Sequence, residues 1–271
     1  MIEELVRIAE IAAEEILDIY HSNFEVKSKS DESPVTRADL AAHRAIVQEL
    51  RQLDPSIPIL SEESTLPEFS IRKSWQRYWL IDPLDGTRNF VERNDEFTVN
   101  IALIQDGVPV LGVVGVPTLE CVYIGDVASR KAMKRASGTM HSIGTRKRRR
   151  SRATLVESRH NTTPANEVIA DYLVAKQQVS VDRTQMGSSL KICVIAEGQA
   201  DLYLRMGLTS EWDIAAASAV LLAANGDLRM LGGYPKKYNE QESVLNSSFF
   251  ACGDDPNYWT RVIADALPNP G

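Results

Sequence analysis

The 271-residue sequence predicts a protein of the α/β (α+β) class in which helices and sheets form layers. Three observations support this prediction. Apolar residues near the N-terminus recur at helical spacing, short apolar segments separated by turn signals follow them, and from about residue 130 strands and helices alternate. The length allows one large core or two closely packed parts. We therefore predict one compact unit with two sub-domains, residues 1–130 and 131–271.

The first part is predicted to contain two helices and an antiparallel sheet. Apolar residues at helical spacing predict an amphipathic helix over residues 2–20 and a second helix over residues 36–53. A Gln-Asp-Gly sequence between two apolar segments predicts a hairpin. Five segments are predicted as strands: IPIL (57–60), YWLI (78–81), FTVNIALI (97–104), PVLGVVGV (109–116) and CVYIG (121–125).

The second part is predicted to alternate strands with helices. Gly187 and Gly198 flank one predicted helix, and Gly226 is predicted to stop another. The predicted elements are the strand ATLVESR (153–159), helices over 165–176 and 187–198, the strand ADLYL (200–204) and a helix over 212–224.

Composition narrows the class of protein. With 44% hydrophobic and 25% charged residues the chain is ordinary for a globular protein, and its net charge of -7 argues against a general nucleic-acid binder. The three cysteines are widely spaced and lack a Cys-x-x-Cys pattern, which favours a reduced protein without disulfides. Glutamates interrupt the apolar positions of the N-terminus, so we expect no signal peptide, and no apolar run reaches the length of a membrane span. The expectation is a soluble, cytoplasmic protein.

A run of basic residues, RKRRRSR at 146–152, is the largest local shift in composition. Such a run could bind nucleic acid, acidic lipid or an anionic substrate. We favour a solvated loop between the two parts, because runs of this kind are common without a function. A peripheral contact with the inner face of the cell membrane stays open, and so does a protein that acts only by binding anions.

Acidic residues gather where predicted elements end or begin. In folds of this class, sites are built where strands end, so these side chains are candidates for one shared site. The candidates are Asp39, Glu62, Glu63, Asp82, Asp85 and Asp213.

The segment DPLDGT (82–87) has the strongest signal among them. Pro83 fixes the backbone, so a tight turn can aim both carboxylates and the Leu84 carbonyl at one point. Oxygen ligands of this kind suit Mg²⁺. Gly86 and Thr87 would open a helix or turn whose free N–H groups can hold a phosphate. The alternative is that the two aspartates merely form an Asx-turn and a cap.

The other acids have simpler alternatives. A glutamate pair such as 62–63 is usually a solvated turn, and Asp213 at a helix start is a favourable partner of the helix dipole as well as a possible metal ligand. Thr36 and Asp39 fit a capping box. In the functional interpretation Asp39 orients Thr87, which in turn orients a water molecule. The spacing does not separate these interpretations.

Several enzyme classes lack their signatures in this sequence. No cysteine is followed by an arginine six positions later, and the patterns D-x-D-x-[TV], G-x-x-x-x-G-K-[ST], G-x-G-x-x-G and H-E-x-x-H are absent. The four histidines are scattered, which argues against a zinc site. We interpret His160 as a surface residue, with substrate contact as the alternative.

Four segments occur in a characteristic order: SPVTRAD, LSEES, DPLDGTRNF and EWDIAAASAV. Together they resemble the lithium-sensitive, Mg²⁺-dependent phosphatases of the inositol monophosphatase superfamily, over nearly the whole chain. The longer segments RYWLIDPLDGT, EFTVNIALIQDGVPVLGVV and GSSLKICVIAEGQADLY resemble the branch of bacterial 3′(2′),5′-bisphosphate nucleotidases of the CysQ type.

The resemblance implies a layered αβαβα sandwich, two or three Mg²⁺ ions and inhibition by lithium. It implies as metal ligands Glu62, Asp82, Asp85, Asp213 and the carbonyl of Leu84. It implies that Asp39 and Thr87 activate the water and that Gly86 with Thr87 holds the phosphate. The residues that it implies around the substrate are Glu62, Leu84, Asp85, Gly86, Thr87 and Asp213.

The expected activity is hydrolysis of 3′-phosphoadenosine 5′-phosphate to AMP and phosphate, which would clear a by-product of sulfate assimilation. The partner would be this small nucleotide, with adenine recognised near GSSLK and MGLTSEWD; the sequence predicts no particular oligomeric state. Arg88 and Asn89 stand where those nucleotidases usually carry lysine and glutamate. Asn89 therefore favours an inositol or sugar phosphatase as the alternative.

Overall fold

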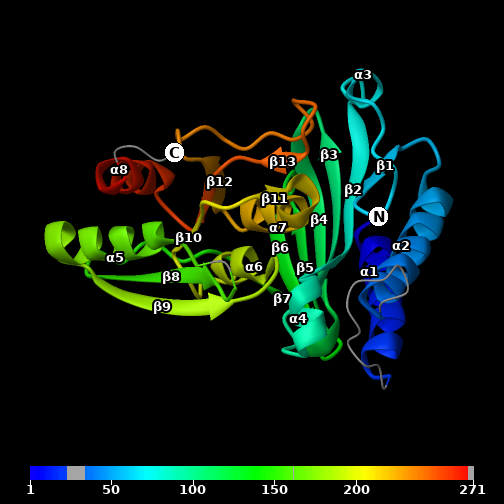
Figure 1. Cartoon of the computed structure of the whole chain (residues 1–271), viewed down its shortest axis with the longest axis horizontal. Helices are drawn as coiled ribbons and strands as arrows, with labels where there is room; N and C mark the ends of the chain where they lie inside the picture. Colours follow the sequence, from blue (N-terminus) through cyan, green and yellow to red (C-terminus); the bar gives the residue numbers. More distant parts are fainter. Residues whose placement is uncertain (23–33, 161, 268–271) are drawn as a thin grey trace.

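Five layers of helices and sheets follow one another across the molecule (Figure 1). In order they are a helix pair, a seven-stranded sheet, a second helix pair, a five-stranded sheet and a third helix pair. The structure is a computed structural model, which describes residues 1–22, 34–160 and 162–267 and gives the backbone alone for 34–36. The αβαβα sandwich expected from the resemblance is confirmed.

The first layer consists of two helices packed side by side, α1 (Ile2–Tyr20) and α2 (Pro34–Leu53). The apolar positions of α1, such as Leu5 and Ile16, are buried against the first sheet, as its helical periodicity predicted. The second helix begins two residues earlier than predicted, because proline suits the first helical position.

The second layer is a seven-stranded sheet in which the strands lie in chain order. β1 and β2 run parallel, and every later neighbour is antiparallel. The three central predicted strands form the hairpins that the turn signals indicated. The strands are β1 (Ile59–Ser61), β2 (Arg77–Asp85), β3 (Thr98–Gln105), β4 (Val108–Val116), β5 (Cys121–Asp126), β6 (Lys131–Ala136) and β7 (Thr139–Ser142).

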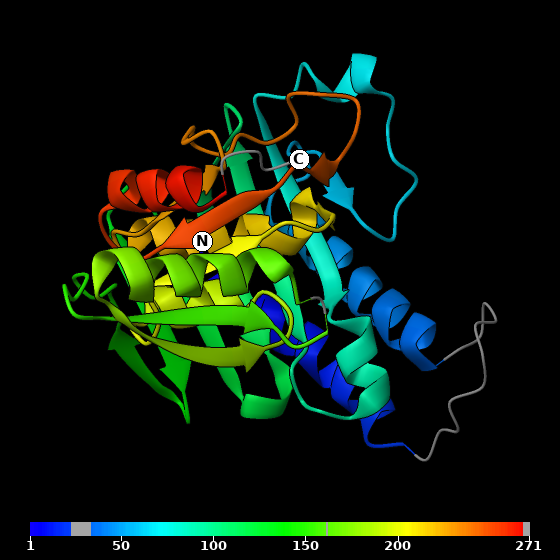
Figure 2. The same ribbon diagram turned by 60° about the vertical axis from the view of Figure 1, so that its left-hand side comes forward.

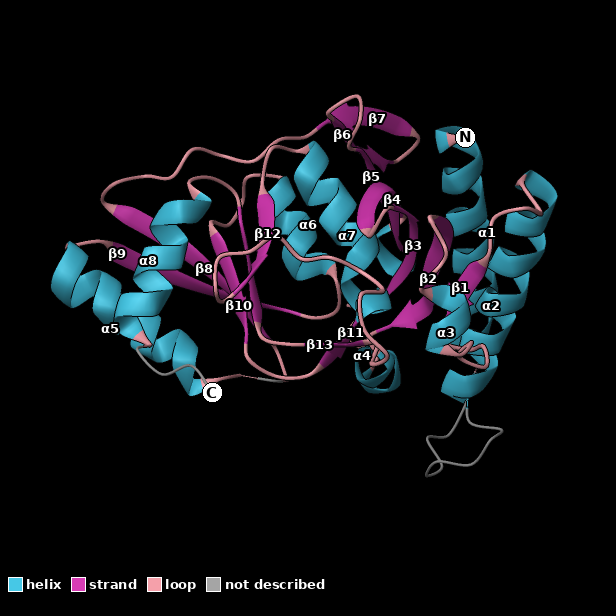
Figure 3. Ribbon diagram, turned by 90° about the horizontal axis from the view of Figure 1, so that it is seen from above, coloured by secondary structure: helices cyan, strands magenta, loops and turns pink. Residues whose placement is uncertain are grey.

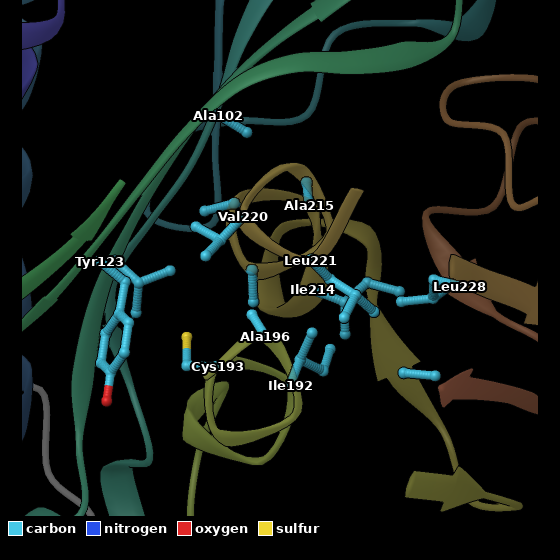
Figure 4. Packing of buried hydrophobic residues seen from close by; sticks show 14 of the residues in the cluster. Ala102, Tyr123, Ile192, Cys193, Ala196, Ile214, Ala215, Val220, Leu221 and Leu228 are labelled. Carbon is cyan, nitrogen blue, oxygen red and sulfur yellow. The ribbon is translucent and has the colours of Figure 1, made fainter. Parts of the chain in front are cut away.

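The middle layer holds α6 (Leu190–Ala196) and α7 (Glu211–Ala223), which lie between the two sheets (Figure 3). Both helices are buried on nearly every side, so they carry no polar face. Figure 4 shows Val220 and Ala215 of α7 packed between Ala102 of the first sheet and the side chains of α6. This layer joins the two sheets into one hydrophobic core.

The fourth layer is a five-stranded sheet in the order β12-β14-β10-β8-β9, with parallel pairing only among β8, β9 and β10. The outer helices α5 (Pro164–Gln177) and α8 (Pro256–Ala266) pack together over it (Figure 2). The strands are β8 (Arg152–Ser158), β9 (Ser180–Met186), β10 (Leu202–Arg205), β12 (Asp227–Met230) and β14 (Phe249–Cys252).

Short elements complete the connections: α3 (Phe69–Arg72), α4 (Thr87–Glu92), the 3₁₀ turn Pro117–Leu119, and the two-stranded ribbon β11 (Thr209–Ser210) with β13 (Leu245–Asn246). The first sheet runs to the end of β7, and the second begins with β8. The division into sub-domains at residue 130 stays a prediction. Within the described ranges, every helix is too short or too polar to cross a membrane.

Candidate active site

Three carboxylates from distant parts of the chain meet beside the end of β2. Glu62, Asp82 and Asp213 each place one carboxylate oxygen within 4.8 Å of the other two. Glu62 directly follows β1, Asp82 lies near the end of β2, and Asp213 lies in the first turn of α7. Because β1 and β2 run parallel, their carboxyl ends reach the same edge of the sheet. The structure thus brings together three of the candidate ligands.

The Asx-turn considered for DPLDGT is present, but it does not account for the position of Asp82. The Oδ1 atom of Asp82 accepts a hydrogen bond from the N–H of Leu84 at 3.1 Å. The Asp82 side chain is nevertheless only 1% exposed and lies among other acids. An Asx-turn needs a polar side chain, but it does not need that side chain to be buried. Burying a carboxylate among like charges costs free energy, so the turn alone does not explain the position of Asp82.

Asp85 is held by two serines from the second half of the chain. Its Oδ2 atom accepts hydrogen bonds from the Ser188 hydroxyl at 2.5 Å and from the Ser189 N–H at 2.8 Å. Both serine hydroxyls lie within 2.9 Å of Thr98 Oγ1. Ser189 also donates to Asn100 Oδ1 at 2.8 Å. A buried polar network therefore fixes the orientation of Asp85.

Ser188 and Ser189 lie in the segment GSSLK, which was expected near the adenine, but their contact with Asp85 was not predicted from the sequence. A helix was predicted over 187–198, whereas α6 begins three residues later. Ser188 has a left-handed backbone (φ 52°), which the interior of a right-handed helix excludes. The Ser189 N–H bonds to Asp85, which lies 104 positions away in the chain. No local pattern in the sequence signals a contact of that separation.

The clustered acids raise one another's pKa values. Burial, followed by the charges of Asp85 and Glu62, raises the pKa of Asp82 well above its usual range. Burial and then Asp85 raise the pKa of Asp213 to about 8. Burial and the two glutamates after β1 raise the pKa of Asp39 to about 9. Glu62 keeps one exposed side, yet the loss of solvent around its carboxyl also raises its pKa. These groups cannot all stay ionised without positive charge nearby.

The chemistry of the cluster fits a hard divalent cation. Its side-chain donors are all carboxylate oxygens, which Mg²⁺ and related ions prefer. The Oδ1 atom of Asp39 is buried and has no hydrogen-bond partner among the described residues. A bound cation would compensate the mutual repulsion and the burial of these acids.

Asp39 lies on α2, close enough to the cluster that its charge contributes to the raised pKa of Asp82. The helix begins at Pro34, so Thr36 stands inside its first turn rather than at a cap; the side chain of Thr36 lies outside the described part of the chain. Thr87, the first residue of α4, is exposed. No hydrogen bond joins Asp39 to Thr87 among the described residues.

Gly86 shapes the turn that joins β2 to α4. Its φ is 93°, and a Cβ atom at this position would lie 2.9 Å from the backbone oxygen of Glu96. Only glycine satisfies both conditions. The N–H groups of Thr87 and Arg88 lie in the first turn of α4, where a helix leaves such groups without backbone partners.

A cavity of about 290 Å³ adjoins the acids and is lined by both signs of charge. Asp85, Thr87 and Asp213 contribute to its lining. Lys191 and Arg205 line the same cavity.

Lys191 and Arg205, two of the basic residues that line this cavity, are fixed by the protein. Burial lowers the pKa of Lys191 to about 8, and its ammonium group donates to the carbonyl of Ser188. The guanidinium of Arg205 donates to the carbonyls of Gly207 and Leu208 at 3.1 and 2.9 Å. The cavity therefore presents ordered cations within reach of the acid cluster.

Three arginines of the basic run 146–152 have partners within the chain. Arg146 makes two hydrogen bonds to the carboxylate of Asp201, at 2.8 and 2.6 Å. Arg148 stacks on the ring of Tyr258, with 3.8 Å between the guanidinium carbon and the ring centre. Arg152 pairs with Asp182, while Lys147, Arg149 and Arg150 are exposed.

Comparison with known proteins gives consistent matches. The sequence matches the inositol monophosphatase family over residues 1–267. It is 45% identical over 251 residues to the 3′(2′),5′-bisphosphate nucleotidase CysQ of Salmonella typhimurium, which covers 92% of this chain and 98% of that protein. The crystal structure of CysQ from Bacteroides thetaiotaomicron matches with a TM-score of 0.83 and 36% identity, covering 93% of this chain and 97% of the other. An inositol monophosphatase from Zymomonas mobilis matches with a TM-score of 0.77 and 25% identity, covering 97% and 96%.

Proposed function

The chain belongs to the inositol monophosphatase family, and from this premise we propose that it is a 3′(2′),5′-bisphosphate nucleotidase. It removes the 3′-phosphate of 3′-phosphoadenosine 5′-phosphate and releases AMP and phosphate. We further propose that it is lithium-sensitive and acts in the cytoplasm on a by-product of sulfate assimilation. The identity to CysQ proteins over most of the chain supports this assignment.

One observation within the site carries the proposal: the cavity beside the acid cluster also contains Lys191 and Arg205. A bisphosphate nucleotide has two phosphates to place. One would lie against the acids and their cations, and the other would meet a buried ammonium or guanidinium group. Inositol 1-phosphate has no second phosphate for these cations.

Two or three Mg²⁺ ions are proposed as cofactors. The residues that would hold them are Glu62, Asp82, Asp85, Asp213 and the carbonyl of Leu84. When bound, such ions lower the pKa of a water molecule and stabilise charge on the phosphoryl oxygens.

The chain's own groups then orient the reactants. Thr87 is proposed to hold the attacking water through its hydroxyl, and Asp39 to orient Thr87 and accept a proton. The N–H groups of Gly86 and Thr87 donate to the phosphoryl oxygens, which favours the charge that develops there. Ser188 and Ser189 hold Asp85 in place throughout.

The alternative of an inositol or sugar phosphatase receives no direct support from Asn89. That side chain is 3% exposed and its amide is bonded within the protein. The alternative of an anion-binding protein is weakened because Arg146, Arg148 and Arg152 have partners within the chain.

The test is phosphate release at fixed Mg²⁺ from 3′-phosphoadenosine 5′-phosphate, inositol 1-phosphate and fructose 1,6-bisphosphate. We expect kcat/KM for the nucleotide to exceed that for inositol 1-phosphate by more than about 100-fold, because inositol 1-phosphate lacks the second phosphate and with it two charge-assisted contacts of roughly 1.5–3 kcal/mol each. Asp85→Asn serves as the blank, folded but nearly inactive. Preference for inositol 1-phosphate or the sugar would overturn the substrate assignment, and wild-type turnover by Asp85→Asn would overturn the role of Asp85.

A further inference from the structure

Asn89 is a buried side chain on the short helix that follows the Gly86 turn. It is 3% exposed, although its neighbours Thr87 and Arg88 are exposed. It lies where a segment of the first sheet meets two segments of the second half of the chain. Its contacts explain why an amide occupies this position.

The backbone of Glu96 fixes the orientation of two amides. A carbonyl oxygen only accepts, so the Asn89 atom that lies 2.8 Å from the Glu96 carbonyl is Nδ2. A backbone N–H only donates, so the Asn94 atom at 3.1 Å from the Glu96 N–H is Oδ1. Asn94 therefore turns its Nδ2 toward Asn89 and donates to Oδ1 at 2.8 Å. The orientation of each amide is therefore fixed by a backbone group that can only accept or only donate a hydrogen bond.

The oxygen of Asn89 in turn decides the tautomer of a histidine. The Nε2 atom of His160 lies 2.8 Å from Asn89 Oδ1 and 3.2 Å from Glu92 Oε2. Both neighbours are acceptors, so Nε2 must carry the proton. The Nδ1 atom has no hydrogen-bond partner among the described residues. His160 lines the same cavity as the acids.

The side chain of Asn89 is closely packed against the backbone of Gly187. A Cβ atom on Gly187 would come 2.2 Å from Asn89 Nδ2, so the chain approaches this amide as closely as glycine allows. Glu96 also accepts from the Gly187 N–H at 2.7 Å and pairs with Arg159 through two hydrogen bonds. The segment before β3 and the ends of β8 and β9 are thus held in one arrangement.

We propose that Asn89 is a positioning residue, which fixes His160 as the Nε2-protonated tautomer and leaves Nδ1 to accept a hydrogen bond from the nucleotide. The inference rests on the proposed function, because it takes the cavity as the nucleotide site. An acceptor suits a donor group of the substrate, such as the exocyclic amine of the base or a ribose hydroxyl. Asn89 also lines this cavity, but its amide is bonded to Glu96, Asn94 and His160, and it acts through His160.

The first test reads the tautomer directly. The chain has four histidines, so ¹⁵N-labelled protein gives few imidazole signals, and His160→Ala identifies the signal of interest. We expect the long-range ¹H–¹⁵N pattern of a ring protonated at Nε2. Asn89→Leu in a Glu92→Ala background, which removes both acceptors that face Nε2, should lose that pattern, whereas Glu92→Ala alone should retain it. A ring protonated at Nδ1 in the wild-type protein overturns the proposal.

The second test is a double-mutant cycle with 3′-phosphoadenosine 5′-phosphate. Asn89→Leu and His160→Ala should each raise KM about tenfold, roughly the worth of one lost hydrogen bond, with kcat within about twofold. The double variant should also show about a tenfold rise, because Asn89 works through His160.

The outcomes separate this inference from the proposed function. If the two rises in KM multiply to about a hundredfold, or if Asn89→Leu lowers kcat alone, the positioning role is wrong. If the wild-type enzyme does not hydrolyse the nucleotide, the proposed function fails and the substrate part of the inference fails with it. The imidazole signals of the free protein still decide the tautomer in that case.

Discussion

The acid cluster and the basic run behave in opposite ways. Glu62, Asp82 and Asp213 are scattered through the sequence but meet within 4.8 Å in the fold. The run 146–152 concentrates six basic residues in seven positions, yet its arginines separate toward different partners. Like charges that are adjacent in sequence spread apart, and like charges distant in sequence are forced together.

The difference indicates which cluster needs a ligand. Arg146 and Arg152 have carboxylate partners and Arg148 packs on a ring, whereas the other three basic residues of the run are exposed to solvent. The acids instead raise one another's pKa values, and only a species of opposite charge can relieve them. Density of charge along a sequence is therefore a poorer guide to function than uncompensated charge in the fold.

The largest effect that would sharpen this comparison is expected for Asp82→Asn. Removing this proposed metal ligand should lower kcat by at least ~10³-fold at saturating Mg²⁺. Removing a buried like charge should leave the Mg²⁺-free protein as stable as the wild type or more stable, because Asp82 is 1% exposed among other acids. Phosphate release at saturating Mg²⁺ measures kcat, and thermal unfolding without Mg²⁺ measures the stability. A variant that loses stability but keeps its turnover would show that Asp82 is structural.

The next effect concerns pH in protein freed of divalent cations. The pKa values of Asp213 and Asp39 are about 8 and about 9 in the folded protein, well above the ordinary aspartate value near 3.9. Between these values the folded protein holds protons that the unfolded chain has released, so stability falls as pH rises. We expect Tm to be roughly 5–10 °C lower at pH 9 than at pH 6.

Mg²⁺ should remove most of that fall, because its proposed binding to the ionised carboxylates would stabilise the folded state. Asp213→Asn is the control and should flatten the slope in cation-free buffer. A Tm that is level across this pH range, or that falls equally with Mg²⁺ present, would contradict the mutual destabilisation of the acids.

The smallest effect is expected in the basic run. Asp201→Asn leaves Arg146 without its counter-charge at a site where Asp201 is 3% exposed, and should cost roughly 2–3 kcal/mol in the free energy of unfolding. Urea unfolding measures this cost, and turnover per folded molecule should not change.

The matched control replaces the three exposed basic residues, Lys147, Arg149 and Arg150, with glutamine. These changes should alter the free energy of unfolding by less than about 0.5 kcal/mol. Binding to anionic vesicles is measured in the same variant. If the wild type binds in a salt-dependent way and the variant does not, the exposed residues of the run have a binding role.

Local patterns predicted the parts of the fold that depend on local interactions. The limits of α1 were correct because its apolar residues repeat at helical spacing along one face. β9 (Ser180–Met186) was missed, since SVDRTQM is largely exposed at the edge of the second sheet and has no alternation of apolar and polar residues. Edge strands are defined by a neighbouring strand more than by their own composition.

The candidate site shows the same limit. The acids could be found because they follow strands or begin helices, positions that the sequence reveals. Asn89 was interpreted as a mark of substrate preference, whereas its amide is bonded to His160, 71 positions away. Contacts of that kind depend on how two sheets pack, and no spacing within either segment encodes them.

The position of Asp213 has a consequence for the way the enzyme is made. Glu62 and Asp82 leave the ribosome long before α7, the helix that carries Asp213 in its first turn and packs between both sheets. A nascent chain therefore cannot complete the ligand set until the middle layer is in place. The proposed Mg²⁺ ions would therefore bind only the finished fold, in which α7 lies against the first sheet, and their binding would be a late step of assembly.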